Sequence, residues 1–126
     1  LRHTVEASLV KAGVLAGLAD ERLARAIMAM HAQPEEAWTL ETLAGVAAMS
    51  RSRFAKDFLD TVGDTAMDYL TDWRISLAQG LLKRGKPLKA VAPAVGYTSE
   101  TTFARAFSRR TGVSPTNWVA RLKVGG

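Results

Sequence analysis

The sequence predicts an all-α protein, and three observations support this fold class. Apolar residues recur at spacings of three and four, the period of a helix that packs on one face. The strict alternation of a strand never persists for more than a few residues. Glycine and proline mark most breaks between the periodic segments. Together these features predict about seven helices.

The first segments are defined by residues that favour or weaken helix ends. Residues 4–18 are a weak helix candidate, because Gly13 and Gly17 lower its helix propensity. Asp20 is a good N-cap, so the next helix should begin there and end before Pro34.

The middle of the chain is expected to hold two shorter helices and a long one. Thr39 should cap the first and Ser50 the second, which Gly63 ends. The long helix is expected from about Thr65 to Lys83. Its apolar stripe is predicted to comprise Ala66, Tyr69, Leu70, Trp73, Leu77 and Leu81.

The C-terminal part repeats this layout of short and longer helices. Pro87 suits the first turn of a short helix. Pro93 should kink or shorten that helix, because it lacks the N–H of an ordinary residue. Ser99 should cap a longer helix that Gly112 ends, and Pro115 starts the last helix.

The two halves share a sequence repeat. The pattern S-x3-F-x3-F-x4-G occupies residues 50–63 and returns 49 residues later at residues 99–112. Upstream of it, Leu40 pairs with Leu88 at an offset of 48. Each half therefore predicts a helix-turn-helix motif. Its paired phenylalanines hold the second helix on the core, so the other face is free to enter a DNA major groove.

Small residues lie where such a motif needs them. Ala44 and Ala92 occupy the helix crossing, where a larger side chain would push the two helices apart. Ala48 and Gly96 occupy the turns. Glycine takes a positive φ there without steric cost, whereas alanine is not expected to do so.

The charge of the chain is unevenly distributed. Residues 1–48 hold four Lys or Arg and six Asp or Glu, a net charge of −2. Residues 49–126 hold thirteen Lys or Arg and six Asp or Glu, a net charge of +7. A basic C-terminal portion suggests a polyanionic partner such as double-stranded DNA.

Other classes of chemistry find little support. The chain has no cysteine, which excludes disulfides and thiolate zinc sites and suits the cytoplasm. His3 and His31 have no partner at metal-ligand spacing, so no metal and no cofactor is expected. No paired acid and base indicates an enzyme, and no apolar run approaches the ~20 residues that span a membrane.

The repeat also selects candidate DNA-binding residues. Because the phenylalanines point inward, the exposed faces of the two second helices carry the polar side chains. The repeat superposes Lys56 on Arg105 and Ser52 on Thr101. Cations in matched positions are what two base-reading helices need.

With these motifs in place, the sequence resembles the DNA-binding domain of the AraC/XylS family of bacterial transcription regulators. The resemblance covers about residues 20–122. It is carried by WTLxxLA at 38–44, MSxxxFxxxF at 49–58, YLxxxRxxxAxxxL at 69–82 and VAxxVGYxSxxxFxRxFxxxxGxSP at 91–115. The last segment is the most specific.

The resemblance implies two helix-turn-helix subdomains, residues 20–64 and 84–126, joined by a linker helix at 65–83. Residues 1–19 are then a remnant of an interdomain linker. The two recognition helices, 50–63 and 99–111, would read adjacent major-groove segments. Family members usually carry a sensor domain for a small-molecule effector, here of the cupin type, and a contact with RNA polymerase is expected.

The resemblance also assigns contacts to individual residues. The positions implied to touch bases are Ser52, Lys56, Glu100, Thr101, Thr102 and Arg105. Candidate phosphate contacts are Arg51, Arg53, Lys86, Arg109 and Arg110. Arg105 suits either guanine or a phosphate. Glu100 either accepts from a cytosine amino group or is a favourable charge at the helix N-terminus with no DNA role. Arg74 is expected to pair with an acid such as Asp72 or Asp57 or to be exposed. As the family's linker-helix arginine, it is alternatively expected to reach DNA or to bridge the subdomains.

Three departures and one alternative complete the expectations. Pro93 breaks the family pattern, Ala48 replaces a glycine, and Trp118 with Val119 stands where the family has Tyr and Arg. The tryptophans at 38, 73 and 118 are expected in the core. The alternative function is an all-α protein-interaction module, which would show an exposed apolar groove in place of a basic face.

Overall fold

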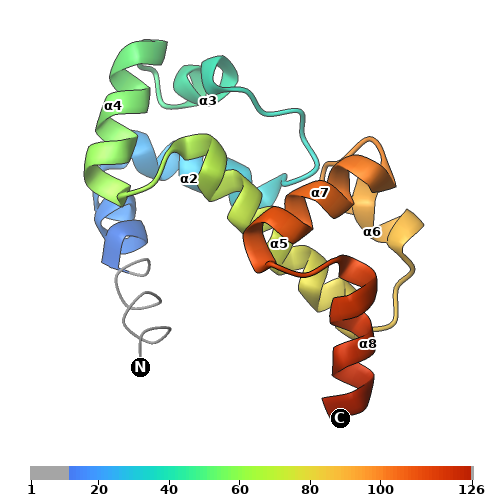
Figure 1. The fold of residues 1–126 in the computed structure, drawn as a ribbon. Helices are drawn as coiled ribbons and strands as arrows, with labels where there is room; N and C mark the ends of the chain where they lie inside the picture. The colour runs from blue at the N-terminus through green and yellow to red at the C-terminus, as the bar shows by residue number, and fades with distance from the viewer. Residues whose placement is uncertain (1–11, 126) are drawn as a thin grey trace. The chain divides into compact units, whose positions relative to one another are not determined.

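The structure, a computed structural model, describes residues 12–125, which fold into α-helices and the turns between them (Figure 1). Residues 12–19 are helical, and no strand occurs between residues 12 and 125. The helices that follow are α2 (Glu21–Ala32), α3 (Leu40–Val46), α4 (Arg51–Val62), α5 (Ala66–Lys83), α6 (Leu88–Ala94), α7 (Glu100–Thr111) and α8 (Pro115–Gly125). The predicted all-α class is confirmed. The first part of the helix candidate at 4–18, and His3, lie outside the described residues.

The expected helix ends are confirmed. Asp20 Oδ1 accepts from the N–H groups of Arg22 and Leu23 at 3.0 and 3.1 Å, so it caps α2. Thr39, Ser50 and Ser99 likewise cap α3, α4 and α7 through their side chains. The C-caps of α4 and α7 are Gly63 and Gly112, with φ of 89° and 83°. Pro87 stands at the N-cap of α6, one residue before the first turn where it was expected.

The chain forms two compact units, each with its own core. Among the described residues, the first unit comprises 12–33 and 38–70, and the second comprises 34–37 and 71–125. In the first unit Phe54 and Phe58 are fully buried among apolar side chains of α2, α3 and α5. In the second, Phe103 and Phe107 are fully buried among those of α5 and α6.

The apolar stripe predicted for α5 holds only in its first part. Ala66, Tyr69 and Leu70 are buried as expected. Trp73, Leu77 and Leu81 are half-buried, and the buried residues of the second part are Ile75, Ala78 and Leu82. Ile75 lies about 140° around the helix from Leu70, at 3.6 residues per turn. The stripe shifts because α5 contributes to two cores, whereas the prediction assumed one.

The expectation for the turn of the first motif was wrong. Ala48 has a φ of 57°, in the left-handed region where Gly96 has a φ of 97°. Both turns close with the same hydrogen bonds. Met49 N donates to Ala44 O at 2.9 Å, and Tyr97 N donates to Ala92 O at 2.9 Å. The shared turn therefore requires a positive φ, and Ala48 takes it despite its Cβ.

Pro93 does not shorten its helix. Both α6 and its counterpart α3 have seven residues, and Val95 N still donates to Val91 O at 3.1 Å. Pro93 itself has no N–H to donate to the carbonyl of Lys89. Because Pro93 lies in the last turn of α6 and is exposed, it removes one helical hydrogen bond and leaves the rest of the turn intact.

Candidate nucleic-acid interface

The second helix of the first motif, α4, has one buried and one exposed face. The rings of Phe54 and Phe58 lie 5.6 Å apart on the buried face. Ser52, Arg53 and Lys56 are exposed. The phenylalanines therefore fix α4 along its length and leave a polar face towards solvent, as the repeat predicted.

The cations of α4 pair with acids one turn further along. Arg53 Nε lies 3.0 Å from Asp57 Oδ2, and Lys56 Nζ lies 2.7 Å from Asp60 Oδ2. The hydrogen bond to Asp60 raises the pKa of Lys56 above its ordinary value. Exposed pairs of this kind are weak, so a phosphate or a base edge can replace the carboxylate.

The second helix of the second motif, α7, is built in the same way. Phe103 and Phe107 lie on its buried face with ring centroids 5.7 Å apart. Exposed residues on the helix include Glu100, Thr101 and Arg105. Thr102 is exposed too, but its backbone N–H donates to Ser99 Oγ at 3.1 Å, and Ser99 Oγ donates to the Thr102 hydroxyl oxygen at 2.9 Å. Thr102 therefore also supports the N-cap.

The candidate phosphate contacts fall into two groups. Arg51, Lys86 and Arg109 are exposed. Arg110 is engaged by Asp72 through two hydrogen bonds of 2.5 and 2.6 Å, and Arg53 is paired as described above. A two-pronged arginine–carboxylate pair holds the guanidinium in a fixed orientation, so Arg110 has a structural partner within the second unit.

Arg74 does not pair with an acid as expected. Its Nε and Nη2 donate to the carbonyls of Pro34 and Glu36, both at 2.8 Å. Its guanidinium lies 5.7 Å from the ring centroid of Tyr97. Burial lowers the pKa of Arg74. Arg74 therefore joins three segments that are distant in sequence, and no local pattern indicates such a role.

A basic pocket lies beside α7 in the second unit and was missed by sequence reasoning. Its volume is about 360 Å³. It is lined by Thr71, Arg74, Tyr97, Thr102, Arg105, Ala106 and Arg109. The repeat selects matched positions, whereas three of these seven residues come from α5 and the turn before α7, which have no matched partner in the first motif.

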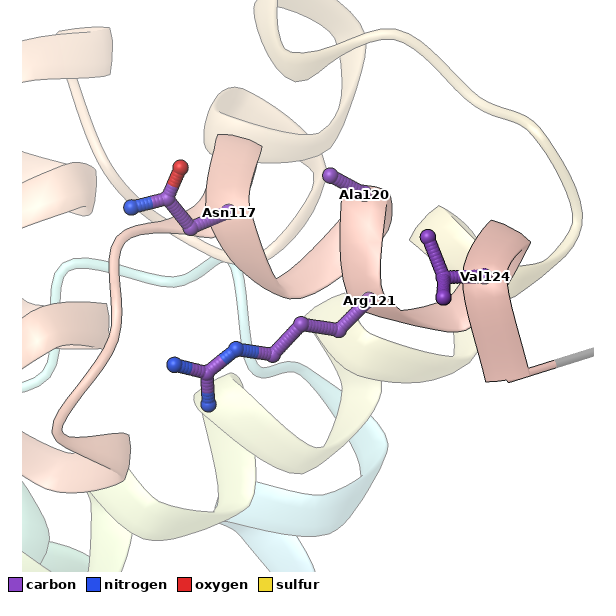
Figure 2. A pocket seen from close by; sticks show the side chains of 4 residues that line it. All are labelled: Asn117, Ala120, Arg121 and Val124. Carbon is purple, nitrogen blue, oxygen red and sulfur yellow. The ribbon is translucent and has the colours of Figure 1, made fainter.

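A second hollow lies along α8. Figure 2 shows Asn117, Ala120, Arg121 and Val124, which line it at the spacing of one helix face. Val124 is 89% exposed. The hollow offers one cation and no converging set of polar groups.

Other kinds of site find no support in the described part of the chain. Between residues 12 and 125, no three His, Cys, Asp or Glu side chains come together as metal ligands. None of the helices described there has the length and apolar character needed to cross a membrane.

Two helix-turn-helix motifs, each with a capped second helix exposed on one face, define a tandem helix-turn-helix protein. Comparison with known proteins agrees. The family described as "Helix-turn-helix domain" matches residues 43–121, more than half of the chain. The chain is 44% identical over 114 residues to a protein of Streptomyces antibioticus described as an AraC-like transcription regulator, covering 90% of the chain and 38% of that protein.

One further relative and one solved structure agree with this class. The chain is 42% identical over 105 residues to the transcriptional regulator AlkR of Acinetobacter baylyi, covering 82% of the chain and 34% of AlkR. It also matches the DNA-binding domain of the transcriptional factor AdpA, solved in complex with a target DNA. That match has a TM-score of 0.76 and 28% identity and covers 80% of this chain and 92% of the other. The chain belongs to the AraC-type helix-turn-helix family and spans about two-fifths of the length of the Streptomyces antibioticus relative.

Proposed function

We propose that this chain binds double-stranded DNA in a sequence-specific manner and so regulates transcription. The observation that carries the proposal is the repeated unit itself: the same closed turn and the same serine cap precede two helices whose exposed faces carry cations. A helix with a buried face and a polar exposed face suits the major groove. The solved complex of the AdpA domain with its target DNA supports this use of the fold.

Base recognition is proposed for the residues that the exposed faces present. Lys56 on α4 and Arg105 on α7 would donate to base edges, with guanine the preferred partner of a forked guanidinium. Ser52, Thr101 and Thr102 would add short-range hydrogen bonds, and Glu100 would accept from cytosine. Arg51, Arg53, Lys86 and Arg109 would contact phosphates and set the register. We leave Arg110 out of this set because it already holds Asp72.

The proposal extends to regions beyond the DNA-binding part, because the relatives of this chain are longer proteins. A sensor domain for a small-molecule effector and a contact with RNA polymerase would convert DNA binding into regulation. The chain would act in the cytoplasm, where bacterial DNA lies, and as a binding protein with no catalytic step. The relative described as an HTH-type transcriptional activator in Escherichia coli, at 38% identity over 111 residues, supports a role of this kind.

The test is in vitro selection of DNA sites with the 126-residue chain, followed by binding of Arg105→Ala to the selected site. The variant should lose roughly 1–3 kcal/mol of binding free energy and relax the preference at one base pair. Arg121→Ala is the matched control, because it removes the same charge from α8, outside both recognition helices. Affinity should also fall steeply as salt rises. A flat salt profile, or equal losses in both variants, contradicts the proposal.

A further inference from the structure

The basic pocket beside α7 combines groups from three elements of the second unit. Arg105 and Arg109 come from α7 at a spacing of four residues, so their side chains rise from the same face. Arg74 comes from α5, and Tyr97 from the turn before α7. The side chains of Thr71 and Tyr97 share a hydrogen bond. Three arginines and three residues with hydroxyl groups thus line one cavity.

The charge of this pocket is not neutralised by its own walls. None of the seven lining residues is acidic. Asp72 lies nearby, but it is bound by both prongs of Arg110. The acidic side chain that acts on Arg74 is Glu35, whose negative charge raises the pKa of Arg74. Three like charges around one cavity repel one another, so an anion that enters the cavity lowers the electrostatic energy of all three.

One wall of the pocket is held in a fixed position. Arg74 is anchored by the carbonyls of Pro34 and Glu36, which use two of the five N–H donors of its guanidinium. The Tyr97 ring packs on the buried Phe103 with centroids 5.6 Å apart. An added Cβ on Gly96 would lie 2.7 Å from Pro34 O and 2.9 Å from Arg74 Cζ, so these groups are closely fitted. Arg74 and Tyr97 are therefore held in place before any ligand arrives.

We propose that this pocket binds a phosphate group, held by Arg109 with support from Arg74, Tyr97 and Thr71, while the guanidinium of Arg105 stays assigned to a base edge. Planar guanidinium groups match the oxygens of a phosphate in a two-pronged manner. The volume of about 360 Å³ lies at the small end of ligand pockets, and the charged lining differs from the apolar lining of most of them. Both features favour a compact oxyanion over an apolar effector.

The phosphate can come from two sources with the same chemistry. One is a backbone phosphate of the bound DNA, and this part rests on the proposed function. The other is a free phosphate or phosphorylated small molecule, which would compete with DNA for Arg109. Both sources predict binding that depends on Arg109 and on the hydroxyl of Tyr97.

The first experiment uses inorganic phosphate and the 126-residue chain without DNA. Thermal unfolding is measured in millimolar phosphate and in chloride at equal ionic strength, for the parent chain, Arg109→Gln, Tyr97→Phe and Lys89→Gln. Lys89 is exposed on α6 outside the pocket, so Lys89→Gln controls for the loss of one charge. A ligand that binds only the folded state raises the melting temperature. The rise should be retained in Lys89→Gln and lost or halved in the two pocket variants.

The second experiment tests the DNA source. Single methylphosphonates, which remove one backbone charge, are placed along a selected site. A methylphosphonate at one position should weaken DNA binding by the parent and by Lys89→Gln tenfold or more. The same substitution in the DNA should have little further effect on binding by Arg109→Gln. Tyr97→Phe keeps the aromatic packing on Phe103, so a loss in that variant reports the hydroxyl.

Each outcome has a defined meaning. A pocket-dependent rise with phosphate, or a methylphosphonate effect that vanishes in Arg109→Gln, supports the pocket as a phosphate site and identifies its source. Equal responses of Arg109→Gln and Lys89→Gln in both experiments overturn it. Failure of the proposed function is a separate result, because then the parent chain selects no DNA site while the phosphate experiment can still be read.

Discussion

Ala48 shows how strongly the helix-turn-helix turn controls single residues. Its φ of 57° lies in the left-handed region that most residues avoid because Cβ approaches the backbone. The corresponding turn of the second motif has glycine and the same closing hydrogen bond. Ala48 is also exposed, so no packing of its methyl group offsets the strain. The strain is therefore located in the turn that precedes α4.

Replacing Ala48 by glycine should stabilise the first unit. The left-handed conformation costs alanine about 1–2 kcal/mol, and the greater freedom of glycine in the unfolded chain returns part of this. We expect Ala48→Gly to raise the free energy of unfolding by roughly 0.5–1 kcal/mol in urea denaturation. Ala24→Gly, inside α2, is the control and should destabilise. A loss of stability in Ala48→Gly would mean that its turn is not strained.

His31 is a second residue whose environment has a measurable consequence. Its Nε2 lies 2.5 Å from the Tyr69 hydroxyl, and the two rings stack with centroids 5.8 Å apart. Partial burial lowers the pKa of His31 from its ordinary 6.5. Below pH 6.5 the unfolded chain therefore binds more protons at this site than the folded chain does. This contribution to stability is present above pH 6.5 and is lost as pH falls towards the folded pKa.

His31→Gln should reduce the pH dependence of stability below pH 6.5. Glutamine cannot take up a proton, yet its amide can still bond to Tyr69. We expect the unfolding free energies of the two chains to run parallel above pH 7 and to converge as pH is lowered to about 5. His3 and all carboxylates are common to both chains, so their titrations cancel in the difference. Parallel curves down to pH 5 would show that the pKa of His31 is not lowered.

The role of a residue could be predicted from the sequence when its partners lie close to it along the chain. The caps Asp20, Ser50 and Ser99 bond to N–H groups two or three residues away, so their roles can be found in the sequence itself. Arg74 bonds to carbonyls 38 and 40 residues away, and those bonds decide its orientation. An Asp two residues from Arg74 was the obvious partner, but that Asp binds Arg110.

At the scale of elements, the two recognition helices were predictable and the linker helix only in part. A regular pair of phenylalanines fixes the inward face of α4 and of α7. In α5 the buried face changes between Leu70 and Ile75, because its two ends pack into different cores. A periodic pattern describes a helix with one buried face. It gives the wrong residues for a helix that supports two cores.

The N-terminal end of α4 gives a prediction that separates folding from DNA binding. Ser50 Oγ accepts from Arg53 N at 3.2 Å, and Asn and Asp cap helices about as well as Ser. Ser50→Asn and Ser50→Asp should therefore have stabilities similar to the parent, within about 0.5 kcal/mol. Only Ser50→Asp adds a negative charge at the end of the helix proposed to meet DNA. We expect it alone to weaken DNA binding several-fold at low salt, measured by fluorescence anisotropy. Equal affinities of the two variants would argue that this end lies away from the phosphates.

At the scale of the whole molecule, two units with separate cores each carry one recognition helix on a single chain. Joining two binding modules makes the second binding event intramolecular, so affinity rises without any new contact. This gain is roughly 10²–10⁴-fold when both modules reach their sites, and it is lost when the geometry forbids simultaneous binding. The tandem fold therefore predicts a DNA site with two half-sites about one helical turn apart.

Spacing between the half-sites is the sharpest test of this tandem use. Inserting five base pairs, about half a turn, moves one half-site to the opposite side of the duplex. We expect the inserted site to bind as weakly as a site in which one half is randomised, because each leaves a single motif engaged. Arg105→Ala and Lys56→Ala identify which half each helix reads, since each variant should become insensitive to randomising its own half. Unchanged affinity after the insertion would mean that one motif alone reads the bases and that the other serves only to complete the fold.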